Sequence, residues 1–188
     1  AGRKVRGLGF LPNKRPLLIV GNHLLGGLDI WLIVPELIQQ RNLFVRGLGH
    51  PVIFHDAESH LKGGPTFLPD STAGKQGTFG LYQKFGAVMA TPTNMHRLLE
   101  TNQVVLHFPG GAREAYHGRE EAHTLFWPIK VDFVRMAAKF NATIVPMSAI
   151  GASDSVYMLA DPEELLKLPF GLNKLVANSF LTVREAAR

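Results

Sequence analysis

One stretch of the chain suits anion binding, because it places an arginine close to two glycines. These residues are Gly110, Gly111 and Arg113. Backbone amides at glycines can approach a ligand without a side chain in the way, and arginine offers a planar, permanently charged fork for phosphate or carboxylate. The stretch follows the apolar run 104–106, so it is equally typical of a plain turn between a strand and a helix. The stretch alone leaves both interpretations open.

Two further apolar runs end in turns of the same kind. Residues 17–20 lead into a glycine-bearing turn that carries His23 and Asp29, and residues 143–145 lead into Pro146. In open α/β sheets, ligands bind beyond the carboxyl ends of the strands, so three such ends predict one shared site. Without further support, a lone histidine at a strand end is more often structural than catalytic.

The elements that must position these residues follow from hydrophobic patterns. Short apolar runs and helical apolar spacing alternate along the chain, which predicts an α/β fold, a layered sheet with alternating strands and helices. We expect strands at 17–20, 43–45, 86–90, 104–106 and 143–145. We expect helices from Ile30, over 79–85, after an N-cap at Asn94, over 133–140 and from Asp161. Residues 55–78 read as a long loop, and Trp127 as a core residue.

Composition narrows the class of protein. The 188 residues, 46% of them hydrophobic, suffice for a single domain spanning 1–188. The absence of cysteine excludes a disulfide framework and a thiolate nucleophile. His55, Asp56, Glu58 and His60 are metal-capable, but no second ligand cluster completes them, so we expect no metal site and no cofactor.

The charge is unevenly placed. The net charge is +5, and five of the 20 basic residues precede the first acid, which leaves 15 to balance the 15 acids. No interleaving of aromatic and basic residues favours nucleic acid, so we expect no nucleic-acid partner. The longest apolar stretches fall short of the ~20 residues that a spanning helix needs, which leaves contact with a membrane surface open. No targeting peptide is visible in the first segment.

Several blocks together resemble the plant and algal phytyl ester synthase/diacylglycerol acyltransferase family, within the wider glycerolipid acyltransferase superfamily. The blocks are Gly21-Asn22-His23 with Asp29, then 108–115, 125–128, 133–137 and 144–146. Their order and spacing cover most of the chain from Leu17 to Asp154. The resemblance implies a glycerolipid-acyltransferase-like fold and a chain that is part of a longer protein. It also implies an O-acyltransferase that moves a fatty acyl group from an acyl thioester to a lipid alcohol, phytol or diacylglycerol.

The resemblance suggests roles for the residues above. An alcohol is a weak nucleophile, so His23 is expected to act as general base, with Asp29 fixing its tautomer. The amides around Gly110 and Gly111 are candidate oxyanion donors, Arg113 a candidate ligand for a donor phosphate, and Pro146 a further substrate contact. In the superfamily the aspartate usually follows the histidine by five positions, whereas here the separation is six. A glycine-permitted bend can absorb the extra residue.

The expected partners follow from the same resemblance. They are an acyl-coenzyme A or acyl carrier protein donor, a lipid alcohol acceptor, and a membrane or lipid-droplet surface. The expected location is the chloroplast, at plastoglobules or the thylakoid surface, where phytyl esters or triacylglycerol would be formed. Two alternatives stay open, a lipid ester hydrolase and a non-catalytic lipid-binding module. The hydrolase would usually need a Gly-x-Ser-x-Gly elbow, which the sequence lacks.

Overall fold

The computed structural model describes residues 7–24, 27–50, 82–129 and 131–155, with residues 164 and 167. Within them, five parallel strands form one sheet in the order β3-β2-β4-β1-β5, which confirms the predicted α/β class. In chain order the elements are β1 (Leu17–Gly21), α1 (Ile30–Arg41), β2 (Val45–Gly49), β3 (Val88–Met89), α4 (Pro92–Glu100), β4 (Val104–His107), α5 (Gly111–Ala115), the 3-10 helix η3 (Arg119–Glu121), α6 (Asp132–Lys139), β5 (Thr143–Met147) and α7 (Ala152–Ser155).

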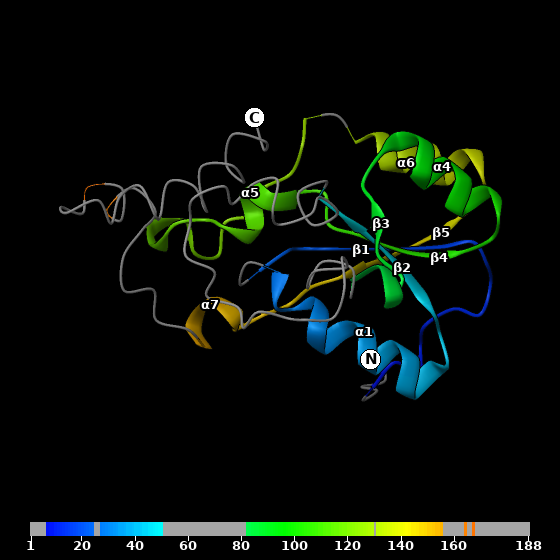
Figure 1. The fold of residues 1–188 in the computed structure, drawn as a ribbon, viewed down its shortest axis with the longest axis horizontal. Helices are drawn as coiled ribbons and strands as arrows, with labels where there is room; N and C mark the ends of the chain where they lie inside the picture. Colours follow the sequence, from blue (N-terminus) through cyan, green and yellow to red (C-terminus); the bar gives the residue numbers. More distant parts are fainter. Residues whose placement is uncertain are drawn as a thin grey trace, which may run out of the picture.

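The sheet is the middle of three layers. Helix α1 covers one face, and α4 and α6 cover the other (Figure 1). Strand β1 is buried along its whole length, and its side chains alternate between the two faces because successive residues of a strand point to opposite sides. Leu17 and Ile19 pack in the cluster under α1, whereas Leu18 and Val20 pack under α4 and α6. A continuous apolar run is therefore what this strand requires.

The described helices agree in part with the helices expected from the sequence. In α6, Phe133 and Ala137 are buried one turn apart, as their spacing predicts. Helix α1 contains Pro35, which has no N–H to donate to the carbonyl group one turn earlier, at Trp31. The N-cap of α4 is Thr91, whose hydroxyl accepts the Asn94 N–H at 3.1 Å, so the predicted cap at Asn94 is wrong by one turn. The signal for the true cap is the proline that follows it.

Several other expectations differ from the structure in detail or lie outside the described residues. Strand β2 begins at Val45 and not at residue 43. The apolar pattern placed the strand too early because Leu43 is buried although it belongs to the connection after α1. The strand predicted over 86–90 is confirmed but shorter, as β3, and residues 82–84 of the helix predicted just before it are helical. Trp127 is 44% exposed and not a core residue. The loop over 55–78, with its metal-capable residues, and most of the region after Asp161 lie outside the described residues.

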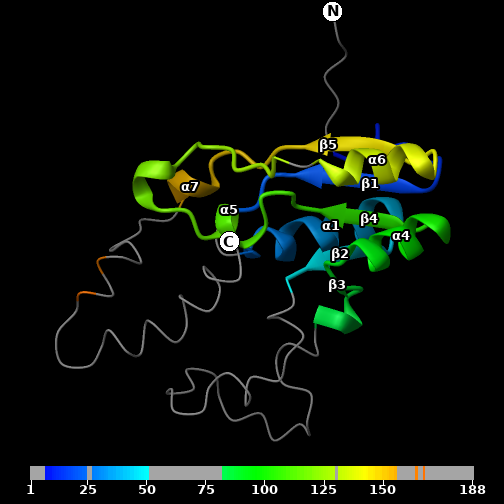
Figure 2. The ribbon, with the colours of Figure 1, turned by 90° about the horizontal axis from the view of Figure 1, so that it is seen from above.

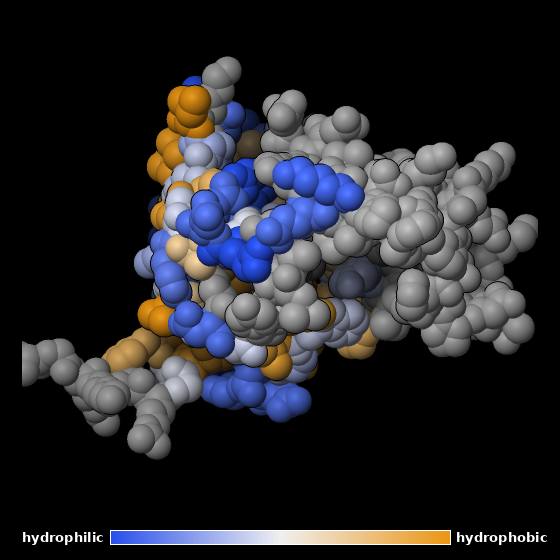
Figure 3. All heavy atoms as spheres, turned by 90° about the vertical axis from the view of Figure 1, so that its left-hand side faces the viewer, coloured by the Kyte–Doolittle hydropathy of each residue, from blue (hydrophilic) through white to orange (hydrophobic). Residues whose placement is uncertain are grey.

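All five strands point the same way, so their carboxyl ends meet at one edge of the sheet. This edge faces left in Figure 1, and Figure 2 shows α5 and α7 beyond it. Figure 3 looks onto this end, where hydrophilic and hydrophobic side chains of the described surface lie side by side. In the described part of the chain, no helix has the length and apolar content to cross a membrane.

Candidate active site

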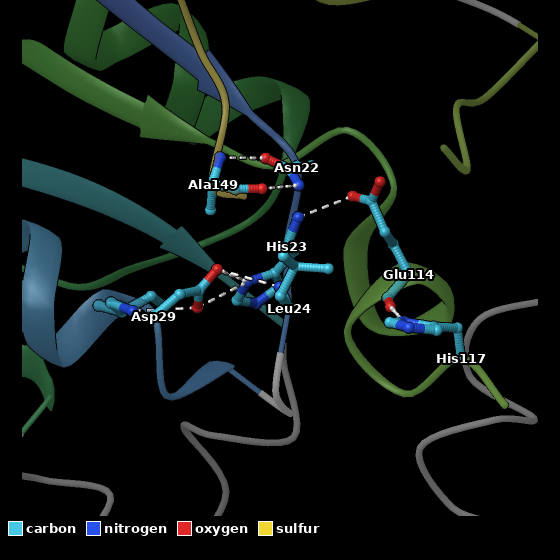
Figure 4. Close-up of polar contacts among 8 residues, drawn as sticks. Asn22, His23, Leu24, Asp29, Glu114, His117 and Ala149 are labelled. Carbon is cyan, nitrogen blue, oxygen red and sulfur yellow. Dashed lines mark hydrogen bonds and ion pairs between the residues drawn. The ribbon is translucent and has the colours of Figure 1, made fainter. Parts of the chain in front are cut away.

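His23 and Asp29 meet just beyond the end of β1. The His23 Nδ1 atom lies 3.2 Å from Asp29 Oδ2 and 3.1 Å from Asp29 Oδ1 (Figure 4). A carboxylate only accepts, so this contact places the Nδ1 proton between the two groups and leaves Nε2 with its lone pair. The six-residue separation is thus compatible with the pairing expected from the sequence. Gly27, with φ of +93°, lies in the intervening turn.

Asp29 is itself held firmly. It stands at the start of α1 and is 5% exposed. Its Oδ1 accepts the Ile30 N–H at 3.0 Å, and its Oδ2 accepts the Leu24 N–H at 3.0 Å. These bonds hold the carboxylate in place at the start of the helix. The His23 ring therefore meets a carboxylate whose position is fixed by the backbone.

The His23 ring is also held by a stacking contact on one face. It stacks on the Phe108 ring with a centroid distance of 4.3 Å and an interplanar angle of 13°. A Cβ added at Gly27 would lie 3.4 Å from His23 Cε1 and 3.6 Å from Nε2. Glycine at position 27 therefore keeps the edge that carries Nε2 uncrowded. The side chain retains 15% exposure, so a ligand can reach it.

Glu114 supports the backbone of the histidine. This residue of α5 is 1% exposed, and its Oε2 accepts the His23 N–H at 2.9 Å (Figure 4). Its Oε1 accepts the Phe126 N–H at 3.4 Å. Burial raises the pKa of Glu114, and the two backbone N–H groups oppose that shift. His117, also buried, donates its Nδ1–H to the Glu114 carbonyl oxygen at 2.7 Å.

Asn22 ties the end of β1 to the end of β5. Its side-chain Nδ2 donates to the Ala149 carbonyl at 2.9 Å, and its Oδ1 accepts the Ala149 N–H at 2.8 Å. An amide side chain here makes the pair of bonds that a strand backbone would make. The β1–β5 pairing therefore continues past Gly21, the last strand residue, to the position before His23.

A cavity of about 480 Å³ opens beside the His23 ring. Its walls come from α1, β2, the segment 82–90, the end of β4, and α5, and they are mainly apolar. The volume falls within the ~300–1,000 Å³ typical of ligand pockets. The cavity is therefore large and apolar enough to hold an alkyl chain next to the His23 imidazole. No group of three or more metal-ligating side chains occurs among the described residues.

The other site residues predicted from the sequence differ in whether they line the cavity. Gly111 lines the cavity with φ of +53°, and its N–H donates to the Phe108 carbonyl at 3.0 Å. Gly110 is packed so closely that a Cβ there would overlap the Phe126 carbonyl oxygen and the Glu114 side chain. Pro146, exposed on β5 opposite Val20, is not among the cavity-lining residues.

Arg113 already has partners within the chain. Its guanidinium pairs with both carboxylate oxygens of Glu121, one at 2.9 Å, and lies 4.2 Å from the Phe126 ring centroid. The hydrogen bonds to Glu121 raise the pKa of Arg113. A donor phosphate would thus have to compete with Glu121 for the same fork.

Two residues of the site, Asn22 and Glu114, received no role from the sequence. Both act on backbone groups of residues far away in the chain, at separations of 127 and 91 positions. The only sequence feature that could have pointed to them is their position in the blocks that resemble the family. Asn22 stands next to His23, and Glu114 comes shortly after the two glycines. Local spacing carries no sign of contacts over such distances.

Comparisons with known proteins agree with the recognised blocks. The profile described as Diacylglycerol acyltransferase matches residues 80–175. Phytyl ester synthase 1, chloroplastic, from Arabidopsis thaliana is 38% identical over 182 residues, which cover 96% of this chain and 23% of that protein. Phytyl ester synthase 2, chloroplastic, from the same plant is 36% identical over 168 residues, 89% of this chain and 22% of that protein.

A bacterial relative matches a shorter region. An uncharacterized protein of Mycobacterium tuberculosis is 36% identical over 90 residues, which cover 48% of this chain and 25% of that protein. The chain thus spans about a quarter of the length of the curated relatives it matches. No solved structure gives a significant match.

Proposed function

This chain belongs to the diacylglycerol acyltransferase family, and from that premise we propose that it carries a site for O-acyl transfer from an acyl thioester to a lipid alcohol. The observation that supports this most directly is the His23–Asp29 pair at the wall of an apolar cavity. A base and a space for an alkyl chain are the two parts that such a reaction needs side by side.

In the proposed reaction, the alcohol oxygen attacks the thioester carbonyl carbon while His23 Nε2 takes the hydroxyl proton. Asp29 accepts from Nδ1–H and stabilises the imidazolium that forms. The tetrahedral intermediate then collapses with cleavage of the carbon–sulfur bond. The proton passes from the imidazolium to the departing thiolate, so the products are an ester and a thiol.

The oxyanion of the intermediate requires donors that are in place beforehand. We assign this role to the turn at Gly110 and Gly111. Because the Gly111 N–H is taken by the Phe108 carbonyl, the Gly110 N–H is the better candidate of the two. Arg113 is proposed to hold a donor phosphate after exchanging Glu121 for it, and Pro146, exposed on β5, to contact substrate outside the cavity.

The substrates and the location are proposed from the relatives. Two of them are named chloroplastic phytyl ester synthases, which favours phytol as acceptor, with diacylglycerol as the alternative that the family name suggests. The donor is an acyl-coenzyme A or an acyl carrier protein. The proposed site of action is the chloroplast, at a plastoglobule or thylakoid surface.

The test is label transfer with the full-length protein. A labelled acyl thioester is supplied with phytol, with diacylglycerol, or with neither, and the lipid products are separated. Label in an ester that appears only with alcohol supports acyl transfer, free acid formed without alcohol indicates a hydrolase, and binding without turnover indicates a non-catalytic module.

The matched variants are His23→Ala and His96→Ala. His96 lies on α4 and pairs with Glu100, and it is not among the residues that line the cavity. His23→Ala should abolish ester formation in a protein that still folds cooperatively, whereas His96→Ala should behave like wild type. Wild-type turnover in the His23 variant would remove the proposed base.

A further inference from the structure

His23 is joined at two points to the turn that contains Gly110 and Gly111 (the glycine turn). Just before the turn, the Phe108 ring stacks on the His23 imidazole with a centroid distance of 4.3 Å. Just after it, Glu114 of α5 accepts the His23 N–H at 2.9 Å (Figure 4). The proposed base and the proposed oxyanion donor are therefore connected through the two side chains that flank the glycine turn.

The Glu114 carboxylate also binds a third segment of the chain. Its Oε2 accepts the His23 N–H, and its Oε1 accepts the Phe126 N–H at 3.4 Å. The side chain is 1% exposed, so water has little access to these bonds. Because each oxygen has its own backbone donor, a side chain with one acceptor oxygen cannot satisfy both. Loss of either bond leaves a partly buried N–H without its acceptor, which costs free energy.

Gly110 packs directly against this carboxylate. A Cβ added at Gly110 would lie 2.5 Å from Glu114 Oε2, so only a glycine leaves room for the oxygen there. The Glu114 N–H in turn donates to the Gly110 carbonyl at 3.2 Å. The same oxygen, Oε2, thus lies against the backbone of Gly110 and accepts the His23 N–H. The length of the Glu114 side chain therefore sets the spacing between the histidine and the glycine turn.

We propose that Glu114 is a positioning residue that holds the His23 backbone at a fixed spacing from the glycine turn, a role that rests on the acyl-transfer function proposed above. The base must reach the alcohol proton while the turn reaches the oxygen of the same tetrahedral centre. A displacement of about 1 Å between such groups costs about 10²-fold in rate. Glu114 is not among the residues that line the cavity, so its effect passes through the backbone of His23.

Two substitutions at position 114 in the full-length protein remove the carboxylate in steps. Glu114→Gln keeps the shape of the side chain and one acceptor oxygen, whereas Glu114→Met keeps a similar length without an oxygen. Glu120→Gln is the matched control, because Glu120 is an exposed glutamate of η3. Each variant is measured for steady-state ester formation, for thermal melting, and for amide hydrogen exchange by mass spectrometry with fragmentation to single residues.

The kinetic result expected is a graded loss of kcat. Per folded protein, Glu114→Gln should lower kcat by about 3- to 10-fold, the range for one hydrogen bond, and Glu114→Met by about 10²-fold. The Michaelis constant for the alcohol should stay within about threefold of wild type, because the lining of the cavity is unchanged. Glu120→Gln should match wild type in both constants.

Hydrogen exchange tests the same anchor without any turnover. In Glu114→Met, the N–H groups of His23 and Phe126 should exchange about 10- to 100-fold faster than in wild type, as expected for lost bonds to a charged acceptor. The Leu18 N–H, inside β1, should exchange at the wild-type rate. A loss of structure throughout the sheet would instead raise exchange at all three positions and would contradict a positioning role.

Two further results would overturn the proposal. One is a wild-type kcat in folded Glu114→Met, and the other is an unchanged exchange rate at the His23 N–H. If Glu114→Met does not fold, Glu114→Gln decides the outcome. A lower kcat with faster exchange at His23 or Phe126 supports the proposal, and wild-type values of both count against it. Failure of wild type to form ester from any alcohol would refute acyl transfer, whereas the exchange rates would still report on the Glu114 anchor.

Discussion

Replacing Asp29 by asparagine changes one atom of the carboxylate into an amide nitrogen and keeps the shape of the side chain. The carboxylate accepts from three donors, the His23 Nδ1–H, the Leu24 N–H and the Ile30 N–H. Asparagine has a single acceptor oxygen, so it cannot serve all three. Where its NH₂ group faces the ring, Nδ1 must become the acceptor and the ring proton moves to Nε2. The base then presents a proton to the substrate where a lone pair is needed.

The size of the effect follows from this change of tautomer. An equivalent substitution in a serine protease triad costs about 10⁴ in kcat, and loss of a general base alone costs at least about 10². We therefore expect Asp29→Asn to lower kcat by about 10²- to 10⁴-fold, equal to about 2.7–5.4 kcal/mol of transition-state stabilisation. Asparagine remains a good helix cap, so the free energy of unfolding should fall by only about 1–3 kcal/mol.

The assay is steady-state ester formation by the full-length protein with varied alcohol, combined with thermal melting. Asp132→Asn is the matched control, because Asp132 also lies in the first turn of a helix but is exposed and pairs only with Arg135 among the described residues. The control should keep wild-type kcat. A variant Asp29→Asn that keeps kcat within about threefold and changes only the Michaelis constant would refute the orienting role.

Gly110→Ala should unfold or strongly destabilise the protein in a melting experiment, because its Cβ would overlap the Phe126 carbonyl oxygen. Gly111→Val has space around its Cβ, so it should mainly remove turnover by filling the cavity, although valine is strained at this positive φ. Arg113→Lys should raise the Michaelis constant for phosphate-bearing donors but not for a short thioester that lacks phosphate, and equal losses on both donors would show that Arg113 supports the loop. Burial lowers the pKa of His107 from 6.5 to about 4. The neutral ring therefore contributes to the free energy of unfolding above pH 6.5, and this contribution, at most about 3 kcal/mol, is lost as the pH falls toward 4. In chemical denaturation, the free energy of unfolding of His107→Phe should lack that part of the pH dependence.

Two of the three inner strands could be predicted because they contain apolar runs. Strand β1 and the first three residues of β4 are buried on both faces, so their sequences are continuous apolar runs. Strand β2 was displaced by two residues in the prediction. Its own sequence contains Arg46 and two glycines, while Leu43, which lies before it, is the buried apolar residue. Apolarity reports burial, and burial does not require a strand.

The candidate site could be predicted in part. His23 and Asp29 are close in sequence, and their blocks are recognisable, so their pairing could be anticipated. The roles of Asn22 and Glu114 could not, because each bonds backbone groups that the fold brings from remote parts of the chain. Trp127 was wrongly predicted to be a core residue. Its ring touches Phe133, but much of its surface stays exposed.

The anchoring of His23 bears on how this site can vary among sequences. Asn22 is fixed to the strand end at Ala149 and the His23 N–H to Glu114, so these two contacts do not depend on how many residues separate the histidine from the aspartate. Closing a loop costs little more when one residue is added. We therefore expect the turn between the histidine and the aspartate to tolerate an added residue while the histidine backbone stays in place. A search pattern with a fixed histidine–aspartate interval would discard such chains, whereas one built on the asparagine, the histidine and the distant glutamate would retain them.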